Sequence, residues 1–94
     1  MDRTLLTIDV DRRNYGWRYR MLPIDAISRT ELLIDFSGGT LRPEQIDLRA
    51  GDIIRWLDNG KRVQAHITQV WREGFQLRAA LTDAELLPAD LFLP

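Results

Sequence analysis

The fold is decided by the stretch DIIRWLDNGKRVQAHITQVWREGFQLRAAL, which occupies residues 52–81. Apolar and polar residues alternate within it over three successive runs, 52–58, 63–71 and 75–81. Alternation places successive side chains on opposite faces, as in antiparallel strands with one buried face. The pair Asn59-Gly60 joins the first two runs and favours the type I′ turn of a two-residue hairpin. The stretch therefore predicts a three-stranded antiparallel meander.

The same period of two continues upstream, in residues 4–10, 15–22 and 32–36. Short strands at intervals of roughly ten residues, without long helical patterns between them, are typical of a small barrel or sandwich. Closing the sheet would remove its free edges. We therefore predict an all-β fold, a small antiparallel β-barrel of six or seven strands. The side chains expected in its core are Trp17, Ile34, Phe36, Ile54, Trp56, Ile67, Trp71, Phe75 and Leu77.

The C-terminal part departs from this alternation. Thr82 and Glu85 have the spacing of a capping box, and a proline follows shortly after them. We expect a short helix near residues 82–87. The tail 86–94 is mostly apolar, so Leu86-Leu87 should pack on the open end of the barrel. The last residues should contact a second chain, which would produce a homo-oligomer.

Composition limits the chemistry that this chain can perform. Its 94 residues make one domain, 1–94. The absence of cysteine excludes disulfides, thiolate catalysis and cysteine-ligated zinc. The single histidine, His66, alternates onto the face opposite the core and cannot form a two-histidine metal site. The carboxylates are scattered, mostly at turns. We therefore expect no enzymatic activity, no catalytic residue, no metal ion and no cofactor.

The beginning of the chain, Met1-Asp2-Arg3-Thr4, lacks the basic-then-apolar pattern of a secretory signal. No apolar run is long enough to cross a membrane. We expect a cytoplasmic protein without membrane insertion. The formal net charge of −1 weighs against a general nucleic-acid binder.

Arginines and aromatic residues interleave over residues 12–20. Guanidinium groups form bidentate hydrogen bonds with phosphate and stack on planar rings. One interpretation is a binding surface, and the other is a strand whose aromatic face is core and whose arginines are solvated. The arginines considered as ligand-binding residues are Arg12, Arg13, Arg18 and Arg20.

A second candidate site is the segment Asp35-Phe36-Ser37-Gly38-Gly39-Thr40. Asp35 and Ser37 point to the same face if the segment is a strand. The two glycines allow a ligand to approach the backbone closely. The candidate ligand-binding residues are therefore Asp35, Ser37, Gly38 and Gly39. The alternative is a tight turn in which the acid or the hydroxyl caps local amides.

Taken in order, these segments resemble the PilZ family of small β-barrels. Residues 35–39 are similar to the Asp-x-Ser-x-x-Gly motif of the family, and residues 48–54 to the Gly-Asp loop that follows it. Residues 63–71 and 74–78 resemble the closing hairpin. The resemblance covers residues 30–81 and implies a PilZ-like barrel in a bacterial signalling or motility protein.

The resemblance also implies a ligand, cyclic di-GMP, held between the arginines and the Asp-Ser-Gly segment. This chain departs from the family pattern twice. No two arginines have the Arg-x-x-x-Arg spacing, and Gly39 comes one position early, with Thr40 in its expected place. We therefore predict a degenerate member with weak or absent cyclic di-GMP binding that acts through protein–protein contacts. The open alternatives are a cyclic di-GMP receptor, a small SH3-like or OB-like barrel that binds nucleic acid, and a structural subunit assembled through its tail.

Overall fold

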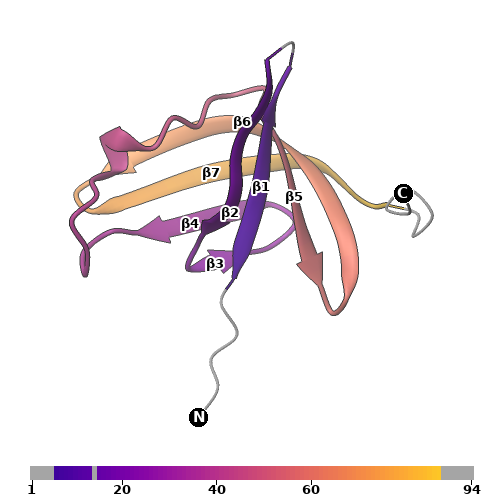
Figure 1. Cartoon of the computed structure of the whole chain (residues 1–94), viewed down its shortest axis with the longest axis horizontal. Helices are drawn as coiled ribbons and strands as arrows, with labels where there is room; N and C mark the ends of the chain where they lie inside the picture. Colours follow the sequence, from indigo (N-terminus) through magenta and orange to yellow (C-terminus); the bar gives the residue numbers. More distant parts are fainter. Residues whose placement is uncertain (1–5, 14, 88–94) are drawn as a thin grey trace.

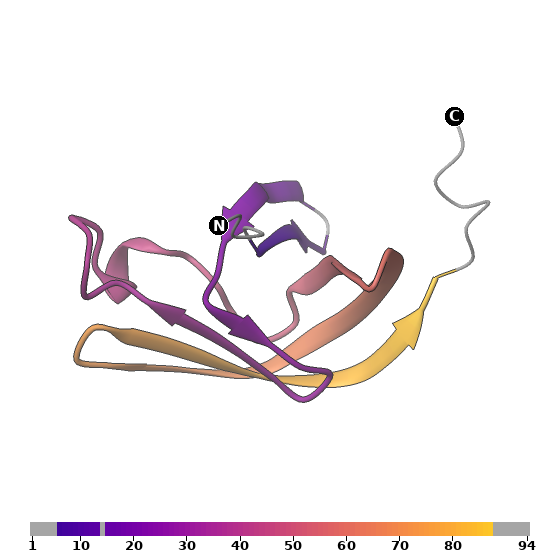
Figure 2. The same cartoon turned by 90° about the horizontal axis from the view of Figure 1, so that it is seen from below.

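The computed structural model describes residues 6–13 and 15–87. These residues form one sheet of seven strands in the order β2-β1-β5-β6-β7-β4-β3, with every neighbouring pair antiparallel. The sheet curls into a half-barrel (Figures 1 and 2). The predicted all-β, antiparallel fold is therefore confirmed. The elements are β1 (Thr7–Arg12), β2 (Gly16–Pro23), β3 (Ala26–Ile27), β4 (Glu31–Asp35), the 3-10 turn η1 (Pro43–Gln45), β5 (Ile53–Asp58), β6 (Lys61–Glu73) and β7 (Gln76–Leu86).

Within the described ranges, no helix combines the length and the apolar character that crossing a membrane requires.

The link between β2 and β3 joins the two ends of the sheet order. β2 pairs with β1 at one end, and β3 pairs with β4 at the other. The N–H of Ile24 donates to the carbonyl of Leu6 at 3.0 Å, and the next N–H, of Asp25, donates to the carbonyl of Leu33 at 3.0 Å. Consecutive residues therefore bond to the residue just before β1, on one side of the order, and to β4, on the other side. This link holds the sheet in its curled shape (Figure 2).

The predicted meander is present, and its first turn has the expected type. Asn59 and Gly60 have φ angles of 53° and 80°, the pair of positive values that a type I′ turn requires. Gly74, with φ of 60°, is the first central residue of the turn between β6 and β7. Tight turns fix the register of both hairpins.

The concave face of the sheet holds the core. Ile34, Ile54, Trp56, Ile67 and Leu77 are buried as predicted. Phe36 is partly buried and packs against them. The other buried apolar residues are Ile8, Val10, Leu22, Ile24, Leu32, Ile46, Leu48, Val63, Ala65, Ala79 and Leu81.

Trp17 was predicted in the core and is instead 52% exposed. A bulge in β2 is the reason. Trp17 pairs with Asp11 and Tyr19 pairs with Val10, so Arg18 is an extra residue on the β2 side. The bulge breaks the alternation, so that Tyr19 packs against the core while Trp17 shares the convex face with Asp11.

The same effect exposes Trp71, another predicted core residue. Ile67 pairs with Leu81 and Gln69 pairs with Ala80, so Thr68 is an extra residue in β6. Beyond it, Val70 packs against the core and Trp71 turns outward. The prediction for Phe75 is also wrong, because this residue lies in the β6–β7 turn and is exposed.

The predicted helix near residues 82–87 is wrong, because β7 continues through this segment to Leu86. His66 pairs with Thr82 and Gln64 pairs with Glu85, which places two residues of β7 opposite one residue of β6. Asp83 occupies this bulge with φ of 57°, a left-handed conformation that aspartate tolerates. The cross-strand partners on β6 thus override the local capping pattern.

The expectation that Leu86 packs on the barrel is also wrong, because this side chain is exposed. The next residue, Leu87, is half-buried and its N–H donates to the carbonyl of Arg62 at 2.9 Å. The predicted contact of the last tail residues with a second chain falls on residues 88–94, which lie outside the described part of the chain.

Candidate functional site

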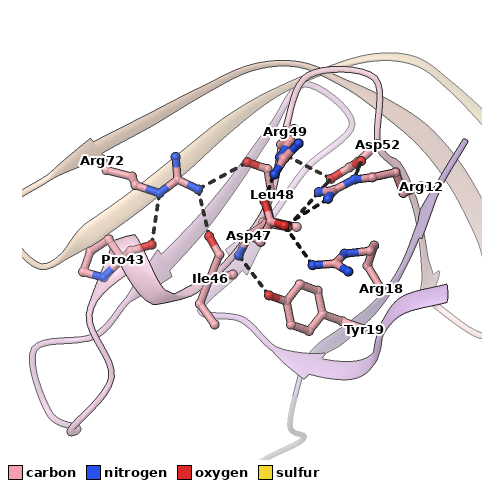
Figure 3. A network of polar contacts seen from close by, with 10 residues as sticks. All are labelled: Arg12, Arg18, Tyr19, Pro43, Ile46, Asp47, Leu48, Arg49, Asp52 and Arg72. Carbon is pink, nitrogen blue, oxygen red and sulfur yellow. Dashed lines mark hydrogen bonds and ion pairs between the residues drawn. The ribbon is translucent and has the colours of Figure 1, made fainter. Parts of the chain in front are cut away.

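The segment between β4 and β5 is held in place by arginines from three strands (Figure 3). Arg12, at the end of β1, donates from Nε and Nη2 to the two carboxylate oxygens of Asp52, each at 2.9 Å. Its Nη1 donates to Asp47 Oδ2 at 2.9 Å and its Nη2 to the Asp47 carbonyl at 3.0 Å. The Asp52 side chain is 2% exposed and that of Arg12 is 13% exposed. This is a largely buried bidentate ion pair.

Asp47 is the centre of the arginine cluster. Its Oδ2 also accepts from Arg18 at 2.8 Å, and its Oδ1 accepts from Arg49 at 2.9 Å. Its backbone N–H donates to the hydroxyl of Tyr19 at 2.9 Å. Hydrogen bonds from Arg12, followed by Arg49, hold the pKa of Asp47 well below its usual range. Hydrogen bonds to Asp52 and Asp47 raise the pKa of Arg12 above the ordinary value for arginine.

The buried Asp52 also shapes the turn before β5. Its carboxylate accepts the backbone N–H of Arg49 at 2.9 Å, and its own N–H donates to the Arg49 carbonyl at 3.1 Å. Gly51, at φ of 96°, supplies the left-handed conformation that this turn requires. The Asp52 carboxylate thus organises the turn that leads into β5.

Arg72 of β6 fixes the other end of the same segment. Its Nε donates to the carbonyl of Pro43 at 3.0 Å, and its Nη2 donates to those of Ile46 at 2.8 Å and Leu48 at 3.2 Å (Figure 3). These residues are buried, and one side chain satisfies three of their carbonyls. Arg72 therefore has a structural role.

The four arginines predicted to bind a ligand are placed in different surroundings. Arg12 and Arg18 meet at Asp47. Arg20 lies over the ring of Trp17, with 4.2 Å from its guanidinium carbon to the ring centroid. Arg13 is exposed. The guanidinium groups of Arg12 and Arg18 thus point at carboxylates of the protein itself.

The predicted Asp35 segment has the geometry of a tight turn at the end of β4. Asp35 Oδ1 accepts the N–H of Ser37 at 2.8 Å, and this bond, followed by that of the Ser37 hydroxyl, lowers the pKa of Asp35. The N–H of Gly39 donates to the carbonyl of Phe36 at 3.1 Å. Gly38 and Gly39 are exposed. Within the described ranges, no hydrogen bond joins this turn to the four arginines.

The sequence did not identify Asp47, Asp52 and Arg72 as the residues that organise this region. Acids at turns favour local backbone hydrogen bonds, and the bond from the Arg49 N–H to Asp52 is only half of the role of Asp52. Twelve of the thirteen basic residues are arginine, the residue type that forms bidentate hydrogen bonds with carboxylates. This composition is the feature of the sequence that indicates such ion pairs.

The convex face carries a separate hollow of about 380 Å³ around the exposed Trp71. Further along this face, Arg55 donates to Gln64 Oε1 at 2.8 Å and forms an ion pair with Asp11. The side chains that line the hollow are Glu31, Trp71, Glu73, Gln76 and Arg78.

His66 alternates onto the convex face, between the buried Ala65 and Ile67, as predicted. The side chain is half-buried, and its Nδ1 makes no hydrogen bond with the described residues. Within those residues, no three acidic or histidine side chains are grouped as ligands of a metal ion.

Comparison of the chain with protein-family models, with curated proteins and with solved structures finds no significant match.

The depressed pKa of Asp47 predicts a dependence of stability on pH. The pKa of Asp47 is lower in the folded state than in the unfolded state, where it is about 3.9. Asp47 therefore stabilises the fold fully when the pH is above this unfolded-state pKa. That stabilisation is lost progressively as the pH falls below about 4. Urea unfolding from pH 7 to pH 3 should therefore show the difference between wild type and Asp47→Asn shrinking with pH. A difference that stays constant over this range would contradict the assignment.

Proposed function

We propose that this chain is a non-catalytic, PilZ-like binding module, cytoplasmic and bacterial, that acts through protein–protein contacts with weak or absent cyclic di-GMP binding. The observation that supports this proposal is the ion pair between Arg12 and the buried Asp52. A guanidinium group already bonded to two carboxylates has few donors left for a phosphate.

The energy of that ion pair explains why the nucleotide should bind poorly. If Arg12 turned to a phosphate, Asp52 would remain as an unpaired charge in the interior. Leaving one partner of a buried pair unpaired costs about 3–5 kcal/mol, equivalent to a loss of roughly two to four orders of magnitude in affinity. Arg18 is restrained in the same way, though less strongly, because it is more exposed.

The exposed surface of β2 favours a protein partner. Trp17 and Met21 are exposed on β2, Tyr15 is exposed just before it, and Arg20 stacks on Trp17. Tryptophan, tyrosine and arginine are the residue types that dominate binding energy at protein interfaces. β2 also stands at one end of the sheet order. Nucleic acid has less support as a partner, because the net charge is −1 and the three arginines clustered at Asp47 are all in ion pairs.

Titration calorimetry with cyclic di-GMP tests the nucleotide part of the proposal. We expect no measurable binding up to about 100 μM ligand, by the affinity argument above. Sub-micromolar binding that is abolished by both Arg13→Ala and Asp35→Ala would instead establish the receptor alternative. Sub-micromolar binding that survives both substitutions would contradict the PilZ-like placement of the site as well.

Affinity capture with quantitative mass spectrometry tests the protein-contact part. A partner recovered with the wild type should be depleted at least tenfold with Trp17→Ser, since hot-spot truncations cost about 2 kcal/mol or more. Arg78→Ser, which changes an exposed residue on the distant strand β7, is the matched control and should retain the partner. Equal recovery with all three proteins would contradict the assignment of the β2 surface.

A further inference from the structure

One row of paired residues crosses the convex face of the sheet from β2 to β7. Its members are Trp17, Asp11, Ile53, His66 and Thr82. The row includes one of only three residue pairs that join β1 to β5. Neighbouring strands are about 4.8 Å apart, so the ends of the row lie four spacings, about 19 Å, apart along the curled sheet (Figure 2). Because the face is convex, side chains at the two ends point away from each other.

The β2 end of the row is basic and aromatic. Residues 12–24 contain four arginines and no acid. Two of the four, Arg13 and Arg20, are exposed and form no ion pair with a described residue. Trp17 is exposed in the same strand, beneath the guanidinium of Arg20. This β2 surface therefore offers two unpaired positive charges and an aromatic ring.

The other end of the row, the β7 end (residues 82–86), is acidic. Residues 79–87 contain no base, and their two acids are Asp83 and Glu85. Both are exposed, and neither forms an ion pair with a described residue. Strand β4 pairs with β7 only as far as Ala80, so the β7 end has no neighbouring strand on that side. Leu86 is exposed next to the acids.

Charged side chains between these two ends pair with each other. Asp11 forms an ion pair with Arg55, and Asp9 forms one with Arg62. The unpaired charge along this row is therefore positive at β2 and negative at the β7 end. These two surfaces are too far apart to meet within one chain, but they can meet between two chains.

A second copy of the chain complements both surfaces. We propose that the β2 surface of one copy docks on the β7 end of a second copy, with its two unpaired arginines facing the two acids and with Trp17 against Leu86. Opposite charges steer the two surfaces together, and the aromatic and aliphatic side chains are buried in the contact. This inference rests on the proposed role of the β2 surface as a protein interface, and it names the partner.

Contacts between like surfaces are disfavoured. Two β2 surfaces would place arginines opposite arginines, and two β7 ends would place acids opposite acids, which is destabilising. The contact is therefore head-to-tail rather than two-fold symmetric. Each added copy leaves one β2 surface and one β7 end unoccupied, so association continues past the dimer unless the rotation closes a ring.

Sedimentation equilibrium over a concentration series tests this self-association. At an ionic strength of about 20 mM, where the Debye length is roughly 20 Å, the average mass should rise with protein concentration past that of two chains. At about 1 M salt, where the Debye length is about 3 Å, association should weaken about tenfold or more. A chain that stays monomeric up to about 1 mM protein would overturn the proposal. The capture experiment with Trp17→Ser would still decide, separately, whether β2 binds a different protein.

Two charge-reversed variants locate the contact. Arg13→Glu with Arg20→Glu reverses the β2 surface. Thr82→Lys with Glu85→Arg reverses the β7 end and leaves Asp83 in its bulge. Each variant should weaken self-association about tenfold or more, because like charges then face each other. Association of wild-type strength in either variant would overturn the proposal, as would a mass that levels off at two chains.

A matched control and a mixing experiment complete the test. Arg42→Glu with Arg78→Glu makes the same change in net charge as the β2 variant, at exposed positions outside both surfaces, and should associate like the wild type. Mixing the two reversed variants should restore association, because opposite charges again face each other, and this restoration also shows that both are folded. Adding Trp17→Ser to both should remove it without altering net charge. A mixture that stays monomeric although both proteins keep the wild-type circular dichroism spectrum would refute the contact. Restored association that is insensitive to Trp17→Ser would refute it as well.

Discussion

Replacing Arg12 with methionine is expected to destabilise the fold by about 3–5 kcal/mol, which is the usual cost of leaving one member of a buried ion pair without its partner. The substitution keeps much of the side-chain volume but leaves the carboxylate of Asp52, 2% exposed, without its bidentate partner. It also removes one of the three arginines that meet at Asp47. Urea unfolding followed by tryptophan fluorescence would measure the loss.

The matched control for this prediction is Arg13→Met, at the exposed neighbouring position. It should change the free energy of unfolding by no more than about 0.5 kcal/mol, as surface substitutions usually do. Adding Asp52→Asn to the Arg12→Met variant should recover part of the loss, because it removes the unpaired charge. Equal stability of the Arg12→Met and Arg13→Met proteins would refute the assigned role of the ion pair.

Arg72→Met is expected to cost about 3 kcal/mol, because three carbonyl groups lose a charged hydrogen-bond donor, and such bonds contribute about 1.5–3 kcal/mol each with incomplete additivity. Its effect should also be local. The carbonyls of Pro43, Ile46 and Leu48 belong to the segment before β5, so this segment should loosen first. Tryptic cleavage after Arg49 should therefore accelerate by more than the change in global stability accounts for.

The control for this prediction is Arg78→Met, on the neighbouring strand of the same hairpin and on the convex face. It removes an arginine of the same kind without touching the segment before β5. Cleavage after Arg49 at the wild-type rate in the Arg72→Met protein would show that the three hydrogen bonds do not hold the segment.

The parts of the fold that sequence predicts well are those specified by nearby residues. The meander follows from alternation and from Asn59-Gly60 and Gly74, whose backbone conformations are set within the turn itself. The bulges could not be predicted in this way. A single extra residue, such as Arg18 or Thr68, leaves the apolar pattern nearly unchanged and still reverses the face of every side chain beyond it.

The C-terminal end of β7 and the arginine cluster also could not be predicted, because both depend on residues that are distant in the sequence. Thr82 and Glu85 suit a helix locally, but their partners on β6 make them a strand. Arg12 bonds to carboxylates that are 35 and 40 residues away in the sequence. Residue type alone indicated that Arg12 would bind an anion. Only the folded chain shows that the anion is an aspartate of the same molecule.

The short pairing between β1 and β5 also constrains the order in which this chain can assemble. The β1–β2 hairpin and the meander β5–β6–β7 close short loops, whereas the contact of Arg55 with Asp11 spans 44 residues. Because the entropy lost on closing a loop grows with its length, and distant contacts slow folding, the two hairpin units should form before they join. The contacts that join them include the three residue pairs of β1 with β5 and the ion pairs of Arg55 with Asp11, Arg62 with Asp9 and Arg12 with Asp52. The charged side chains between β1 and β5 should therefore contribute late in folding, when the β1–β2 hairpin packs against the β5–β6–β7 meander.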